Sequence, residues 1–120
     1  MSKFCTTKDD YIIVMLTGDL DHHITRELRE EIDGLILEKK IFNIVFDFMR
    51  VSFMDSSGIG LLMGRYKKIH PMNGQIYVCN LSISIQRIFK LSGLYNITSH
   101  SFEIDHMVKE VTYEQNENRI

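Results

Sequence analysis

The chain has 120 residues, a formal net charge of −2 and only two cysteines, Cys5 and Cys79. This length fits a single domain with one hydrophobic core. A near-neutral charge without a block of like charges argues against a nucleic-acid-binding protein. No stretch approaches the roughly 20 apolar residues of a membrane-spanning helix, and the N-terminus lacks the apolar run of a signal peptide. We therefore expect a soluble, cytoplasmic protein with buried free thiols.

Strand and helix patterns alternate along the chain. The predicted strands are 3–7, 11–17, 41–48, 75–79 and 97–102, and the predicted helices are 22–40, 57–70, 84–91 and 105–114. Strands separated by helices need crossover connections, which make most of the sheet parallel. The predicted fold is an α/β domain over residues 1–114. It has a small open mixed β-sheet of four to five strands, an edge hairpin and about four helices, which cover one face well and the other only partly. Residues 115–120 are expected to be a disordered tail.

The most informative segment reads FMDSSGIGLLMGRY. Asp55, Ser56 and Ser57 follow an apolar strand directly, and Gly58 and Gly60 open a helix. The two hydroxyl groups therefore lie at a helix N-terminus, which tolerates an added anion. The segment contains no nucleophile elbow and no Walker loop, and no base or metal motif accompanies it. We interpret Ser56 as a phosphorylation switch, although the residues alone leave Ser57, or simple helix capping, as alternatives.

The same predicted helix has an unusual outer face when successive residues are placed 100° apart. The expected core side carries Ile59, Leu62, Met63, Tyr66 and Ile69. The opposite side carries Ser57, Gly60, Leu61, Gly64, Arg65, Lys67 and Lys68. A glycine in a helix costs about 1 kcal/mol relative to alanine, and an exposed leucine gains nothing from water. The pattern predicts a docking surface for another protein. The alternative is that the two glycines allow close packing within the domain.

A second polar cluster, Asp19, Asp21, His22 and His23, lies at another junction of a strand and a helix. A DHH run also occurs in metal-dependent phosphoesterases. A catalytic metal needs three or more converging ligands, however, and no other histidine shares a motif with this cluster. We expect one aspartate to cap the helix and no metal to bind. In a parallel sheet this junction and the one at Ser56 share an edge, so they can form one interface.

Three blocks of the sequence resemble a known family. They are LTGDLDHH at 16–23, SFMDSSGIGLLMGRYKKI at 52–69 and QRIFKLSGLYNI at 86–97. The chain is similar, from about Phe4 to His106, to STAS domains (sulfate transporter and anti-sigma factor antagonist). Within them it most resembles the anti-sigma factor antagonists of sporulating bacteria.

The resemblance implies a binding module without a cofactor rather than an enzyme. Ser56 is then phosphorylated by an ATP/ADP-bound anti-sigma factor serine kinase, and a PP2C-type serine phosphatase removes the phosphate. The unphosphorylated form binds the kinase and releases the sporulation sigma factor F. The resemblance also places Asp21 on the kinase-binding surface.

The full set of expected partner-binding residues combines this implication with the helix pattern. It comprises Asp21, His22, Asp55, Ser57, Gly58, Gly60, Leu61, Gly64, Arg65 and Lys68. An antagonist in a stress-response sigma cascade is the main alternative. A metal-dependent phosphoesterase using Asp21, His22 and His23 is a minor one. We expect the free protein to be a monomer that binds neither nucleic acid nor a membrane.

Overall fold

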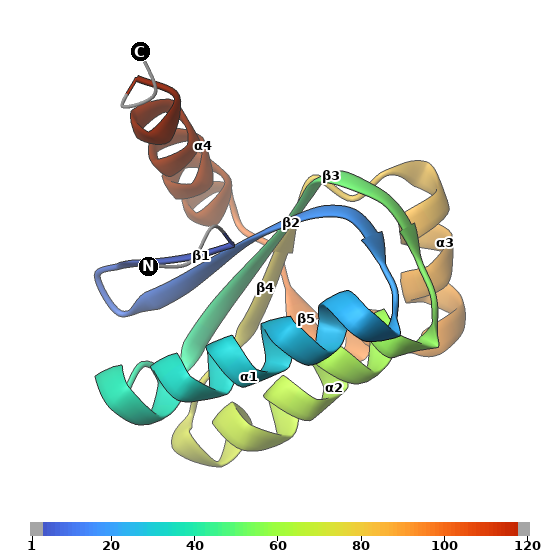
Figure 1. Cartoon of the computed structure of the whole chain (residues 1–120), viewed down its shortest axis with the longest axis horizontal. Helices are drawn as coiled ribbons and strands as arrows, with labels where there is room; N and C mark the ends of the chain where they lie inside the picture. Colours follow the sequence, from blue (N-terminus) through green and yellow to red (C-terminus); the bar gives the residue numbers. More distant parts are fainter. Residues whose placement is uncertain (1–3, 118–120) are drawn as a thin grey trace.

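A computed structural model describes residues 4–117, which form an α/β domain built on one five-stranded sheet (Figure 1). The elements in chain order are β1 (Cys5–Lys8), β2 (Tyr11–Leu20), α1 (His22–Lys39), β3 (Asn43–Met54), α2 (Ser56–Ile69), the short 3-10 helix η1 (His70–Met72), β4 (Ile76–Cys79), α3 (Ile83–Ser92), a second 3-10 helix η2 (Leu94–Asn96), β5 (Thr98–Ser99) and α4 (Phe102–Glu117).

The strands lie in the sheet in chain order, from β1 to β5. The hairpin partners β1 and β2 are antiparallel, and every other neighbouring pair is parallel. This arrangement follows from the sequence, because only β1 and β2 are joined by a tight turn and the later strands are separated by helices. The predicted open mixed sheet with a hairpin at one edge is confirmed.

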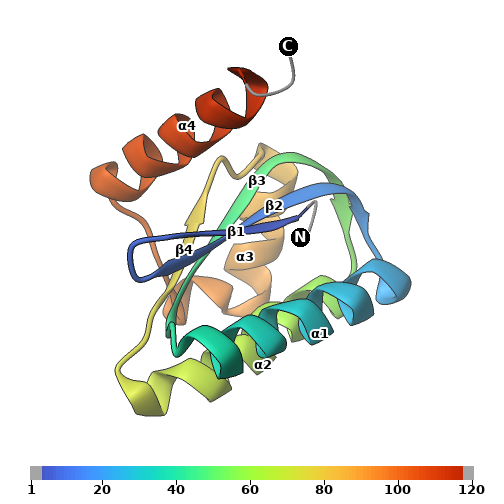
Figure 2. The same ribbon diagram turned by 60° about the vertical axis from the view of Figure 1, so that its left-hand side comes forward.

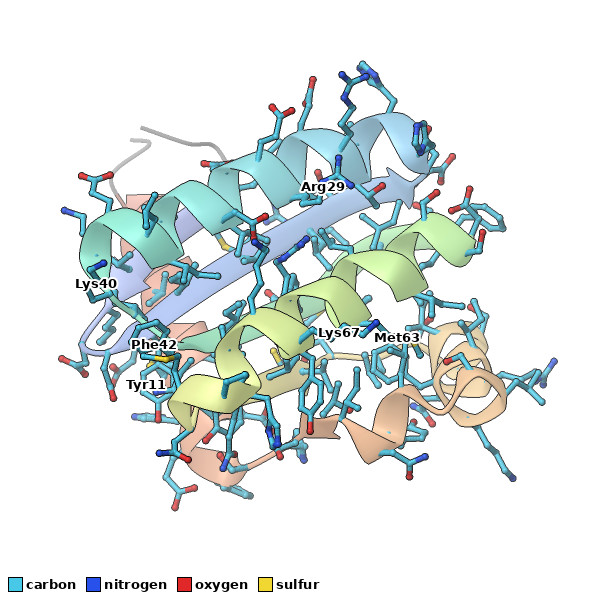
Figure 3. The ribbon with its side chains drawn as sticks, turned by 90° about the horizontal axis from the view of Figure 1, so that it is seen from below. Tyr11, Arg29, Lys40, Phe42, Met63 and Lys67 are labelled. Carbon is cyan, nitrogen blue, oxygen red and sulfur yellow. The ribbon has the colours of Figure 1, made fainter. Side chains whose placement is uncertain are left out.

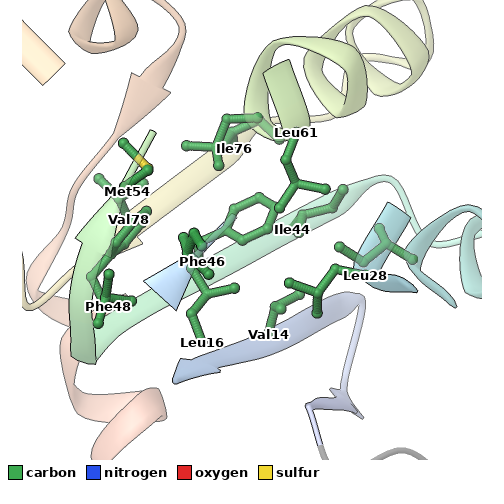
Figure 4. Close-up of a cluster of buried hydrophobic side chains, with 14 of the residues drawn as sticks. Val14, Leu16, Leu28, Ile44, Phe46, Phe48, Met54, Leu61, Ile76 and Val78 are labelled. Atoms are coloured by element: carbon green, nitrogen blue, oxygen red, sulfur yellow. The ribbon is translucent and has the colours of Figure 1, made fainter. Parts of the chain in front are cut away.

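The larger core lies between one face of the sheet and helices α1, α2 and α3 (Figure 4). From β3 the alternate residues Ile44, Phe46 and Phe48 point into this core, as expected for the central strand. The helices contribute Leu28, Ile32, Leu61, Leu62, Ile69, Ile85 and Phe89. This core holds α1 and α2 against the same face of the sheet.

Of the described helices, α4 is the one that covers the opposite face of the sheet (Figure 2). Ile104, Val108 and Val111 of α4 pack on Ile13, Val45 and Cys79 of the sheet. At the hairpin edge, Lys8 Nζ lies 3.0 Å from Glu110 Oε2 of the helix. One face is therefore covered well and the other only partly, as predicted.

Strands β2 and β3 run further than the sequence indicated. Gly18 does not close β2; it has a positive φ of 73° and lies where the pairing with β3 shifts register, and the strand continues to Leu20. Glycine adopts such a conformation without strain and is common at bulges of this kind. The extension carries both strands to the points where α1 and α2 begin.

The C-terminal part differs from the prediction in its boundaries. Only Thr98 and Ser99 of the predicted strand 97–102 pair with β4. The helix α4 starts earlier, at Phe102, because the Ser101 side chain accepts a hydrogen bond from the backbone N–H of Ile104 (3.2 Å) and so caps it. It continues to Glu117, into the segment expected to be a tail. The rest of that segment, 118–120, lies outside the described residues.

Both cysteines are buried and neither takes part in a disulfide, as predicted. Burial, together with the negative charge of Asp47, raises the pKa of the Cys79 thiol to about 12. Within residues 4–117, no helix combines the length and the apolar character needed to cross a membrane.

Candidate functional site

The first residues of α1 and α2 lie side by side at one edge of the sheet. Leu20 at the end of β2 is paired with Met54 at the end of β3. The next residue, Asp55, donates its backbone N–H to the carbonyl oxygen of Leu20 (3.5 Å). The prediction that the DHH junction and the Ser56 junction share one edge is confirmed.

Each helix begins with an aspartate that caps it. Asp21 Oδ1 accepts a hydrogen bond from the backbone N–H of Ile24 (3.0 Å), and Asp55 Oδ1 accepts one from that of Ser57 (2.7 Å). Such caps satisfy backbone groups that the helix itself leaves unpaired. Of the two aspartates that could cap α1, Asp21 does so, whereas Asp19 lies in β2 opposite Phe53.

The two adjacent serines differ in their surroundings. Ser56 is the first residue of α2 and is exposed to solvent. Ser57 is half-buried, and its side chain lines a hollow between α1 and α2. Of the two hydroxyl groups, that of Ser56 is the more accessible to another protein.

We call this hollow the α1–α2 groove. It has a volume of about 230 Å³ and is lined by His22, Thr25, Arg26, Arg29, Ser57, Gly60 and Leu61. Figure 3 shows Arg29 on the edge of α1 that faces α2, whereas Met63 and Lys67 lie on the far edge of α2. Arg26 and Arg29 were not among the predicted site residues. Their spacing after His22 along α1 was the available signal, because residues three or four apart share a helix face.

The glycines of α2 fall into two groups. A Cβ atom at Gly58 would overlap the side chain of Met54, which explains this glycine by packing within the domain. Apart from the adjacent backbone of α2 itself, Cβ atoms at Gly60 and Gly64 would have no heavy atom of the described residues within 4 Å. The alternative that these two glycines allow close internal packing is therefore wrong.

Leu61 and Arg65 are a correction to the predicted outer face of α2. Both are buried, at 3% and 4% exposure, whereas Met63, expected in the core, is 36% exposed. The buried side of α2 is rotated toward α1, relative to the predicted core side, because α2 packs against α1 as well as against the sheet. An exposed aliphatic contact at Leu61 and an exposed cation at Arg65 are both excluded.

Arg65 is buried together with a counter-charge from α1. Its Nε lies 2.9 Å from Asp33 Oδ1, and the exposed Lys68 places its Nζ 3.7 Å from Asp33 Oδ2. Among the described residues, neither Arg65 Nε nor Nη1 has a hydrogen-bond partner, so the contact is mainly one of charge. Burial lowers the pKa of Arg65, and the charge of Asp33 opposes that effect.

Asp21, His22 and His23 do not converge on one point. Asp21 caps α1, His22 lines the α1–α2 groove, and His23 Nε2 lies 3.7 Å from Glu27 Oε1 on the surface of α1. Within the part of the chain that the structure describes, no three histidine, cysteine, aspartate or glutamate side chains are grouped to hold a metal ion.

Comparison with known proteins identifies the family. The sequence model of the STAS domain family matches residues 5–110 of this chain. The chain is 38% identical over 86 residues to the anti-sigma F factor antagonist of Paenibacillus polymyxa, covering 72% of this chain and 74% of the relative. It is 32% identical over 92 residues to the anti-sigma-B factor antagonist of Staphylococcus aureus, covering 77% and 84% of the two chains.

Solved structures agree with these matches. The anti-sigma factor antagonist SpoIIAA in its unphosphorylated form superimposes with a TM-score of 0.76 at 28% identity, covering 90% of this chain and 95% of the other. The Bacillus cell fate determinant SpoIIAA in the phosphorylated form gives a TM-score of 0.69 at 30% identity, covering 87% and 94%. The chain therefore belongs to the STAS domain family. Within it the chain is of the anti-sigma factor antagonist type, so the resemblance seen in the three sequence blocks is confirmed.

Proposed function

We propose that this protein is an anti-sigma factor antagonist whose binding is switched off by phosphorylation of Ser56. In its unphosphorylated form it binds an ATP/ADP-bound anti-sigma factor serine kinase and releases sigma factor F. A PP2C-type serine phosphatase restores this form. The observation that carries the proposal is the exposed hydroxyl of Ser56 at the start of α2, beside the α1–α2 groove. The similarity to anti-sigma F factor antagonists and to a phosphorylated SpoIIAA supports it.

The contact surface is the edge where α1 and α2 begin. It includes Asp21, His22, Asp55 and Ser57, together with Gly60, Gly64 and Lys68 along the exposed side of α2. Gly60 and Gly64 support this assignment, because helix glycines without an internal packing role let another backbone approach closely. Gly58, Leu61 and Arg65 are buried and support this surface from beneath.

A single phosphate has unequal effects on the fold and on the complex. It adds about −1.5 to −2 charges at Ser56. In the free protein these charges lie at a helix N-terminus, where an anion is favoured by about 0.3–1 kcal/mol. In a complex the same group is desolvated beside Asp55, and an unpaired buried charge costs several kcal/mol. A penalty of about 3–4 kcal/mol lowers affinity by two to three orders of magnitude while the domain stays folded.

The test combines variants of both serines with the anti-sigma factor of the same organism and ADP or ATP. Ser56→Ala should bind as tightly as the wild type and take up no phosphate. Ser56→Asp should fold normally and bind at least about tenfold more weakly. Ser57→Ala is the matched control and should still be phosphorylated. Peptide mapping that places the phosphate on Ser57, or a phosphorylated form that binds as tightly as the unmodified protein, would contradict the proposal.

A stress-response cascade is the second candidate, because the chain is 32% identical to an anti-sigma-B factor antagonist. The geometry of the site fits either cascade equally well, since a phosphorylation switch in either one needs an exposed serine at the start of α2. The dissociation constants for purified sigma F-type and sigma B-type anti-sigma factors decide between them. Tighter binding to the sigma B-type protein would replace sigma factor F in the proposal.

A further inference from the structure

The α1–α2 groove contains two cations without a counter-charge. Arg26 and Arg29 are exposed, and neither forms an ion pair with any described residue. The neighbouring cations of α2 differ from them, because Arg65 and Lys68 both lie against Asp33. The positive charge of the groove is therefore available to a group from outside the domain.

The charges of α1 are sorted between its two sides. Glu30, Glu31 and Glu38 line a separate hollow on the side of β1. Glu27 lies against His23, and Asp33, the acid of α1 that faces α2, lies against Arg65 and Lys68. The side of α1 that faces α2 thus carries arginines instead of glutamates, although the whole chain has a net charge of −2.

The two capping aspartates lie at the mouth of the groove and do not neutralise the arginines. Asp21 and Asp55 each direct an oxygen to a backbone N–H of their own helix. Arg26 and Arg29 follow Asp21 by five and eight residues, or about 8–12 Å along the helix axis at 1.5 Å per residue. An anion bound between the arginines is therefore separated from the cap of α1.

The wall opposite the arginines lets a partner backbone come close. Gly60 lines the groove, and Gly64 lies one turn further along α2. Between residues 4 and 117, no heavy atom outside the adjacent backbone of α2 lies within 4 Å of where a Cβ of either glycine would be. A partner segment resting on these glycines can extend a short side chain to the arginines. Arginine forms strong charge-assisted hydrogen bonds with carboxylates in such a setting.

We propose that the α1–α2 groove receives an aspartate or glutamate side chain of the anti-sigma factor, with Arg26 and Arg29 as its counter-charges. This inference rests on the proposed function and specifies how the partner is recognised. Gly60 and Gly64 admit the backbone that carries the acidic side chain. The contact adds two cations of α1 to a surface formed by the starts of both helices and the exposed side of α2.

The test measures binding of the anti-sigma factor, loaded with ADP, to charge-reversal variants. Arg26→Glu combined with Arg29→Glu should weaken binding by at least about 30-fold, because an acidic side chain then meets like charge. The double Arg→Lys variant should keep binding within about tenfold of the wild type. Lys109→Glu is the control: it reverses one exposed charge on α4, the same change of −2 as each single arginine reversal, and it should bind normally. Wild-type binding should also weaken with added salt more steeply than that of the Arg→Glu variant.

The outcomes separate this inference from the proposed function. If the Arg→Glu variant binds within about threefold of the wild type while Ser56→Asp does not bind, the acidic contact is refuted and the phosphorylation switch stands. An equal loss with Lys109→Glu would also refute the contact, because the effect would then be one of overall charge. Failure of the unphosphorylated wild type to bind would overturn both. Thermal unfolding of each variant verifies that the folded state is compared throughout.

Discussion

Arg65 Nε and Asp33 Oδ1 lie 2.9 Å apart, and this ion pair joins α2 to α1. The arginine is 4% exposed, whereas the Asp33 side chain is 27% exposed and also lies near Lys68 Nζ. Because burial disfavours an isolated charge, Asp33 is the group that makes a buried Arg65 tolerable. The pair therefore holds in place the two helices that form the groove.

Asp33→Asn should lower the free energy of unfolding by about 2–4 kcal/mol, because it leaves the buried Arg65 without a counter-charge. Lys68→Met is the matched control, since it removes only an exposed partner of the same aspartate, and it should change stability by less than about 1 kcal/mol. Urea denaturation monitored by circular dichroism measures both. Equal stability of Asp33→Asn and the wild type would mean that water, and not Asp33, offsets the cost of burying the charge of Arg65.

The glycines of α2 give a prediction in which stability and binding change in opposite directions. Gly60→Ala and Gly64→Ala should each raise the free energy of unfolding by about 0.5–1 kcal/mol, because alanine favours the helix and the added methyl group meets no atom. Both should weaken binding of the anti-sigma factor by keeping the partner backbone away. Gly58→Ala is the contrasting control and should destabilise the domain, since its Cβ overlaps Met54. Tighter binding by the stabilised variants would rule out close approach at this face.

Much of the fold could be predicted because its signals are local. The apolar residues of α1 repeat at helical spacing over more than three turns, and the hairpin has a short polar turn, so both were located within a residue or two. The ends of β2 and β3 were predicted too early. Gly18 indicates a bulge as readily as a strand end, and only the pairing with β3 decides between them.

The site was predicted in part for the same reason. The positions of Asp21, Asp55 and Ser56 follow from strand ends and helix caps, which a sequence shows directly. The burial of Leu61 and Arg65 depends on α1 lying beside α2, and the partner of Arg65 is 32 residues away in the chain. A helical wheel contains no information about such a neighbour. Arg26 and Arg29 were not predicted because only the fold places them in one groove with Gly60.

Cys79 should be unreactive in the folded protein. Its pKa is raised to about 12 by burial and by the nearby charge of Asp47, so almost no thiolate exists at pH 8. In a Cys5→Ser variant, which leaves one thiol, labelling by a disulfide reagent should therefore follow the fraction of unfolded protein as urea is added. Rapid stoichiometric labelling without urea would show that the thiol is accessible and ionised in the native state.

The attachment of α4 should depend on pH through Glu110. Lys8, by hydrogen bond and charge, lowers the pKa of Glu110 below the ordinary 4.5, with a further contribution from His106. A carboxyl group whose pKa is lower in the folded state stabilises that state above pH 4.5, and the effect disappears as the pH falls through the lowered value. The wild type should thus have a higher Tm than Glu110→Gln at pH 7, and the two should converge at an acidic pH below the lowered pKa. Glu103→Gln, an exposed change on the same helix, should show no such convergence, because no described cation pairs with Glu103. A Tm difference between Glu110→Gln and the wild type that is the same at both pH values would mean that Lys8 does not hold α4 to the hairpin by charge.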